Sequence, residues 1–185
     1  MMTTSREIRV YDIIDNKAAS NIAMQGLSGV LGFPFTLVAD VTVFFSHYGP
    51  MLNEIREVYG LHPVQESALG AIIKGCKNEV LADLAIDKII GQIPIIGIAA
   101  NMVCAKAMTW RLGILFGMLS ARGDEINTDN AKAAIRMIRQ AFPQSNLATF
   151  TKPTVAVVEK LLKTVEGDSV ESFNNRMIAI LDAMA

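Results

Sequence analysis

The most informative segment of this chain is PIIGIAANMVCAKAMTWRLGILFGMLSA, residues 94–121. Lys106 and Arg111 are its only charged residues, so the segment must be hidden from water inside a helical bundle, against a partner or in lipid. Pro94 suits the first turn of a helix, where its missing N–H costs nothing, and Gly123 is typical of a helix stop. The segment is therefore predicted to form one long helix.

Small or short side chains recur at every fourth position of this segment. The row consists of Gly97, Asn101, Ala105, Thr109, Gly113, Gly117 and Ala121. Four residues advance a helix by slightly more than one turn, so three neighbours of the row share a face although the whole row cannot. We expect the row to serve helix packing, with Gly113, Gly117 and Ala121 letting another helix approach closely.

A second stretch of low charge covers residues 18–53, where Asp40 is the only charged residue. Pro34 is expected to open a helix in this stretch, and apolar residues then recur at helical spacing until Gly60, a predicted stop. Pro50 interrupts the hydrogen-bond ladder of this helix, which predicts a kink or a short break.

The other segments have ordinary amphipathic patterns. The first helix is expected to begin at Thr4, which has capping-box spacing to Glu7, and to run to about Met24. Another helix is expected to open at Pro63. Beyond the loop at Gly123, three more are predicted, and their start signals are Thr128 or Asp129, Pro153, and Asp168.

No segment alternates as a strand would, so the sequence predicts an all-α fold: a compact helical bundle of about six or seven helices built around two apolar helical hairpins. We divide the chain into an N-terminal amphipathic helix (1–26), an apolar helical core (27–123) and a C-terminal amphipathic segment of three helices (124–185). These parts are expected to pack as one domain.

Charged and polar residues within the apolar stretches are expected to be paired. Asp40 and His47 are seven residues apart and so share a helix face. A buried carboxylate needs a capping or cationic partner, which Lys106 or Arg111 would supply. We therefore predict that these four residues form a buried polar group. Exposure of Asp40, an ion route through lipid and a metal site are the alternatives. Lys106 is also expected to stack on Trp110, one turn away.

Catalytic chemistry has little support in this sequence. Neither of the two histidines lies in a recognisable motif, and the glycines within residues 26–32 are not followed by the Gly-Lys-Ser/Thr of a phosphate-binding loop. Cys76 and Cys104 lack the spacing of a zinc site or a disulfide framework. The predicted protein is therefore not an enzyme and has no catalytic, cofactor-binding or metal-binding residues.

Charge and hydropathy limit the partners and the location. The formal net charge is −1 without a long run of one sign, which argues against nucleic acid. Charged residues interrupt positions 1–15, so we do not expect a secretory signal. We expect a cytoplasmic location instead. Residues 34–52 and 93–119 have the length of a membrane span, but Asp, Lys or Arg at its centre costs about 2.5 to 3.5 kcal/mol each. Spanning of the inner membrane, peripheral contact and a fully soluble fold all stay open.

One set of residues resembles a known family. The set is Pro34, Ala39-Asp40, His47, Met51, Ile55, Tyr59-Gly60, Ile93-Pro94, Gly97, Ala105, Thr109 and Leu112-Gly113. It resembles the GTPase-associated bacterial domain of unknown function numbered 697, over about residues 27–122. Tyr59-Gly60 with Glu66, and Pro94 with Gly97 and Asn101, are also similar to the EcsC-like family. The resemblance implies a helical, often membrane-associated module that accompanies a GTPase, and it brings no catalytic residues.

The sequence therefore leads to a hypothesis about function. The chain is expected to be a non-enzymatic helical module whose low-charge hairpins contact a membrane surface or a partner, with a GTPase as the expected partner. A fully soluble structural or protein-interaction domain is the alternative, and a conditional pore or ion-conducting protein is a third. Homo-oligomer formation stays open.

Overall fold

Four helices make up the part of the chain that can be described. The computed structural model describes residues 5–28, 41–65, 97–123 and 151–165, and the single residues 67, 169, 172 and 175. Its helices are α1 (Arg6–Ser28), α3 (Val41–Val58), α6 (Gly97–Ala121) and α8 (Val155–Thr164). These residues contain no strand, so the all-α prediction is confirmed for them. The count of six or seven helices includes predicted helices that lie outside them.

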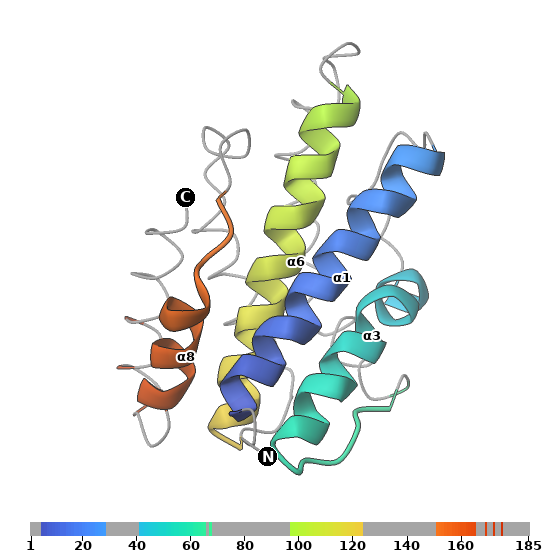
Figure 1. Ribbon diagram of the computed structural model, residues 1–185. Helices are drawn as coiled ribbons and strands as arrows, with labels where there is room; N and C mark the ends of the chain where they lie inside the picture. The colour runs from blue at the N-terminus through green and yellow to red at the C-terminus, as the bar shows by residue number, and fades with distance from the viewer. Residues whose placement is uncertain are drawn as a thin grey trace.

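The helices pack around a central antiparallel pair. α1 and α6 run side by side in opposite directions, with α3 against both on one side and α8 against both on the other (Figure 1). Helices from all three predicted segments of the chain therefore share one core, which is formed by Val10, Tyr11, Ile14, Ala18, Tyr48, Met51, Leu52, Ile55, Val58, Trp110, Leu112, Ile114, Leu115, Phe116, Met118, Leu119, Val158, Leu161, Leu162 and Val165.

α6 is the most enclosed of these helices over its second half. Every residue from Leu112 to Ser120 is buried. Nine consecutive residues cover more than two helical turns, so they point in all directions around the helix axis. A helix that is apolar on all sides belongs in an interior, and here this stretch of the low-charge segment is covered by protein.

Membrane spans were one of the predicted uses of the low-charge segments. Among the described helices, none combines the length and the hydropathy that a bilayer crossing requires.

α1 begins later than the sequence predicts. The Oγ atom of Ser5 accepts a hydrogen bond from the Ile8 N–H at 3.3 Å, which is the geometry of an N-cap. Ser5 is therefore the cap and Arg6 the first helical residue, so the capping position predicted at Thr4 is wrong by one residue. The helix also continues past Met24 to Ser28, because one glycine within a helix costs only about 1 kcal/mol relative to alanine.

α3 ends at the predicted residue. Gly60 has a φ of +73°, a conformation that favours glycine. The N–H groups of Gly60 and Leu61 donate to the carbonyls of Glu57 and Arg56 at 2.9 and 3.0 Å, which is a Schellman motif. The predicted stop is therefore confirmed.

Pro50 does not break α3. The helix is continuous through this residue, so of the two predicted alternatives, a kink or a short break, the break does not occur. Its first turns are seen nearly end-on and its last turns from the side in Figure 1, which is the bend that proline produces by removing one hydrogen bond of the ladder. The start predicted at Pro34 lies outside the described residues.

Local hydrogen bonds define the C-terminus of α6 and the N-terminus of α8. Gly123 has a φ of +71° and its N–H donates to the Ser120 carbonyl at 3.0 Å, so the predicted stop of α6 is confirmed. Thr154 caps α8, because its side chain accepts a hydrogen bond from the Val157 N–H at 3.4 Å. Pro153 therefore precedes the cap, and the prediction that it opens this helix is wrong.

Candidate functional site

The glycines of α6 lie where other helices approach most closely. A Cβ atom at Gly113 would lie 2.5 Å from Cγ1 of Ile14 on α1, and one at Gly117 would lie 3.1 Å from Leu162 on α8 and 3.2 Å from Val10 on α1. Real Cβ atoms do not tolerate the first distance. The close approach expected at these two glycines is therefore present, with two different helices as neighbours.

The rest of the small-residue row has different surroundings. Thr109 is fully buried, and Ala121 is partly buried against the core. The side-chain surroundings of Gly97 and Ala105 lie outside the described part of the structure.

A buried polar cluster lies at the junction of α1, α3 and α6. The Nδ2 atom of Asn21 donates to Oγ1 of Thr109 at 2.8 Å, and the hydroxyl of Tyr48 lies 3.4 Å from the same oxygen. All three residues have no exposed surface. Burial raises the pKa of Tyr48 to about 12, so its phenol stays protonated at neutral pH.

Two members of this polar cluster were missed by the sequence analysis, which assigned Thr109 to helix packing alone. Asn21 follows Val10, Ile14 and Ala18 at spacings of four, four and three, so it belongs to the buried face of α1. A polar residue on such a face needs a hydrogen-bond partner. That pattern predicts a buried contact for Asn21 but does not identify its partner.

His47 lies beside the polar cluster on α3. Its ring is half-buried and meets the edge of the Tyr48 ring, with the centroids 4.8 Å apart. Burial, with a smaller effect from the nearby charge of Lys17, lowers the pKa of His47 to about 4. Burial also lowers the pKa of Lys17. His47 is therefore a neutral imidazole at physiological pH.

The structure describes the side chains of only two members of the predicted buried polar group, His47 and Lys106. The side chains of Asp40 and Arg111 lie outside the described residues. Lys106 is half-buried and makes no ion pair or hydrogen bond with a described residue. The basic neighbour that the structure gives to His47 is Lys17, from a helix that the sequence analysis did not connect with it.

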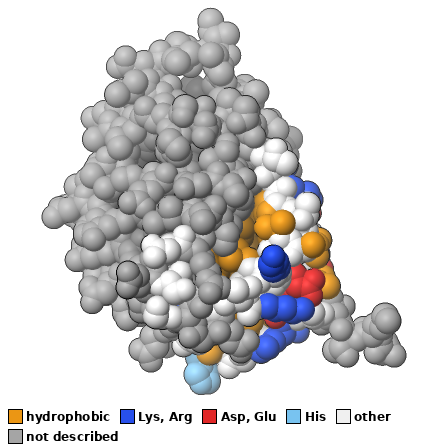
Figure 2. Space-filling view, turned by 90° about the vertical axis from the view of Figure 1, so that its left-hand side faces the viewer, with side chains coloured by type: hydrophobic (Ala, Val, Ile, Leu, Met, Phe, Trp, Pro, Cys, Tyr) orange, Lys and Arg blue, Asp and Glu red, His pale blue; other side chains and the backbone are white. Residues whose placement is uncertain are grey.

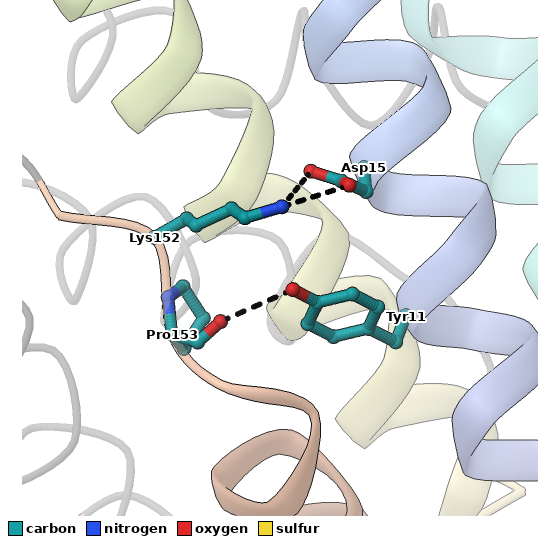
Figure 3. Close-up of polar contacts among 4 residues, drawn as sticks. All are labelled: Tyr11, Asp15, Lys152 and Pro153. Atoms are coloured by element: carbon teal, nitrogen blue, oxygen red, sulfur yellow. Dashed lines mark hydrogen bonds and ion pairs between the residues drawn. The ribbon is translucent and has the colours of Figure 1, made fainter.

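A second polar contact joins α1 to the segment before α8. The hydroxyl of Tyr11 donates to the Pro153 carbonyl at 3.4 Å, and the ammonium of Lys152 donates to both carboxylate oxygens of Asp15 at 3.0 and 2.9 Å (Figure 3). The hydrogen bonds that Lys152 donates to the Asp15 carboxylate raise the pKa of Lys152. These contacts fix the position where the chain enters α8.

Trp110 packs against Tyr11, whereas the sequence predicts that it lies under Lys106. Its ring lies 5.0 Å from the Tyr11 ring, tilted by 58°. The cation over the Tyr11 ring is Lys152, at 5.7 Å. The predicted stacking of Lys106 on Trp110 is therefore not found, because Trp110 turns toward the aromatic residue of α1.

The outer surface near α8 mixes side chains of every kind. Among the described residues on the face shown in Figure 2, basic, acidic and apolar groups lie close together. Lys163 pairs with Glu159 at 2.7 Å, and Val155 and Val157 are 38% and 48% exposed. Single exposed valines are normal on protein surfaces. Within the described ranges, no three His, Cys, Asp or Glu side chains lie close enough together to hold a metal ion.

Comparison of the chain with protein-family models, with curated proteins and with solved structures finds no match in any of the three. The resemblance to the GTPase-associated family therefore stays a prediction that depends on the residues quoted for it.

Proposed function

We propose that this chain is a non-enzymatic helical module that works by binding a partner, and that a GTPase is that partner, as the resemblance implies. The observation that supports this proposal is the burial of Leu112 to Ser120 on all sides of α6. Apolar side chains that are already covered by the protein itself are not free to contact lipid. Partner binding then uses the outer faces of the helices.

The polar clusters support a packing role over a chemical one. The amide of Asn21 and the hydroxyl of Tyr48 both meet Oγ1 of Thr109 inside the core, and the hydroxyl of Tyr11 donates to the Pro153 carbonyl. Hydrogen bonds that join separate helices in this way rigidify an interior and favour one arrangement of it. A rigid set of helices is a suitable platform for protein contacts.

Fractionation tests whether the chain meets the membrane through embedded helices. The untagged chain, expressed in its own cell type, is separated into soluble and membrane fractions, and the pellet is washed with high salt and then with carbonate. We expect the high-salt wash or the carbonate wash to release any of the chain that is found in the membrane pellet. Retention after carbonate would show that apolar helices are embedded, and would support the membrane-spanning alternative instead.

Site-specific photo-crosslinking tests for the GTPase. A crosslinking residue is introduced at exposed positions on three helices, Asn16 of α1, Glu54 of α3 and Lys160 of α8, in cells that are then illuminated. We expect at least one position to give an adduct with a GTP-binding protein whose yield changes between the GTP-bound and GDP-bound states. Absence of any such adduct at all three positions would contradict the GTPase proposal.

Dye leakage separates the module from a pore. Liposomes loaded with a self-quenching dye are mixed with the purified chain over a range of pH. The proposal predicts no release above that of the lipid alone. Release that rises with the amount of chain would favour the conditional pore.

A further inference from the structure

Two rows of side chains with the same spacing meet where α1 packs on α6. Buried residues on α1 recur every four positions, at Val10, Ile14 and Ala18. Small residues on α6 recur with the same period, at Thr109, Gly113, Gly117 and Ala121. Ile14 faces Gly113 and Val10 faces Gly117. Because both rows repeat every four residues, a shift of α1 by four residues would bring similar side chains together again.

Between these two rows, steric contact excludes one direction of shift. A shift toward the start of α6 would bring Ile14 against Thr109, yet even a single Cβ at Gly113 would lie 2.5 Å from Ile14. A shift toward the end of α6 would bring Ile14 to Gly117, which also has no side chain. It would bring Val10 to Ala121, and a Cβ facing Val10 is a contact that a small adjustment relieves, since one at Gly117 would lie 3.2 Å from Val10. The apolar packing therefore leaves one alternative register open, displaced by four residues or about 6 Å.

The buried polar cluster distinguishes the two registers. In the observed one, Asn21 donates to Thr109 at 2.8 Å, and Tyr48 lies 3.4 Å from the same oxygen. In the alternative register, Asn21 would move away from the hydroxyls of Thr109 and Tyr48. It would lie near Gly113, which has no side chain to accept a hydrogen bond. An amide buried without that partner opposes the shift. We propose that the hydrogen bond from Asn21 to Thr109 selects the observed register of α1 on α6. This inference does not depend on the proposed function.

Known proteins use single buried polar residues in this way, most clearly where helices pack through a repeating apolar pattern. The repeat supplies affinity without a unique alignment, and one polar pair fixes the alignment. The chain has the same combination, with Gly113 and Gly117 as the repeating part and Asn21 as the unique part.

Distance measurements between spin labels test the proposal. Labels are attached to cysteines at Arg9, which is exposed on α1, and at Lys106, which is half-buried on α6, in the full chain with both native cysteines replaced by serine. Double electron–electron resonance is recorded for the parent and for Asn21→Leu/Thr109→Val, which replaces the polar pair by apolar side chains of similar shape.

We expect one distance in the parent and two in the double variant. The second distance is longer by up to about 6 Å, because the allowed shift moves Arg9 away from Lys106. Thr109→Ser keeps the hydroxyl and is expected to give the single parental distance. One unchanged distance in the double variant, with parental helical content by circular dichroism, would overturn the proposal.

A milder variant covers the case in which the double variant does not fold. Thr109→Val alone removes the hydroxyl that accepts from Asn21 in the observed register. The Asn21 amide then favours neither register through Thr109, so we again expect the second distance. A single parental distance in this variant overturns the proposal equally. Gly117→Ala, added to either variant, places a Cβ where Ile14 would lie in the alternative register. We expect this addition to remove the second distance. A second distance that persists would show that Ile14 does not need a glycine at position 117.

Discussion

Among the glycines that the structure describes, Gly113 leaves the least room for a side chain. Three carbon atoms of Ile14 would lie 2.5 to 2.8 Å from a Cβ at this position. The sequence predicts a close approach here, because small residues recur at helical spacing on α6. It does not predict that α1 is the helix that approaches, since the row itself contains no information about its partner.

Gly113→Ala is expected to destabilise the protein by about 1 to 3 kcal/mol, because overpacking outweighs the gain of about 1 kcal/mol in helix propensity. Gly117→Ala is the matched control, since its nearest contact of 3.1 Å needs a much smaller adjustment. Urea denaturation of both variants measures the difference. Equal losses, or a larger loss at Gly117, would contradict the packing described at Gly113.

Thr109→Val is expected to lower the free energy of unfolding by about 1 to 3 kcal/mol, because the buried amide of Asn21 loses its acceptor. Asn21→Leu/Thr109→Val removes both partners and is expected to cost less than the sum of the single changes. A double-mutant cycle in urea gives the coupling. Additive effects would show that the two side chains do not interact.

His47 is expected to make stability depend on pH. Its pKa is about 4 in the folded protein, against 6.5 ordinarily. As the pH falls, the unfolded chain therefore binds a proton at this histidine before the folded protein does. The contribution of His47 to the free energy of unfolding is complete above pH 6.5 and is lost as the pH falls toward 4. For a half-exposed ring we expect a loss of about 1 to 2 kcal/mol. Unfolding curves of the parent and of His47→Gln measure it, and identical pH dependence in the two would refute the assignment.

Among the helix boundaries, the stops at glycine are predicted best. Gly60 and Gly123 both have positive φ and both were predicted as stops, because this conformation strongly favours one residue type. Starts are less specific, since Thr4 and Ser5 both carry a hydroxyl that can cap. Tertiary packing settles such choices, and the sequence pattern alone does not contain it.

Ser5→Ala is expected to destabilise the protein by about 1 kcal/mol, because the Ile8 N–H loses its acceptor. Thr4→Ala leaves that acceptor in place and is the matched control, for which we expect a change within about 0.5 kcal/mol. Thermal unfolding under identical conditions compares the two. A larger loss for Thr4→Ala would restore the predicted start of the helix.

At the scale of the whole molecule, the low-charge segments explain why the chain folds as it does. The sequence leaves open whether residues 94–121 pack in a bundle, against a partner or in lipid. In the structure Leu112 to Ser120 are covered by protein. Neither this nor the cluster of Asn21, Thr109 and Tyr48 can be derived from periodicity, because both depend on which helices become neighbours.

Hydrogen–deuterium exchange of the full chain, in aqueous buffer with and without vesicles, tests whether the second half of α6 is a protein core. We expect the amides of Leu112 to Ser120 to be among the slowest to exchange in buffer alone, and we expect vesicles to leave their rates unchanged. Rapid exchange in buffer, with protection that appears only when vesicles are added, would contradict this expectation.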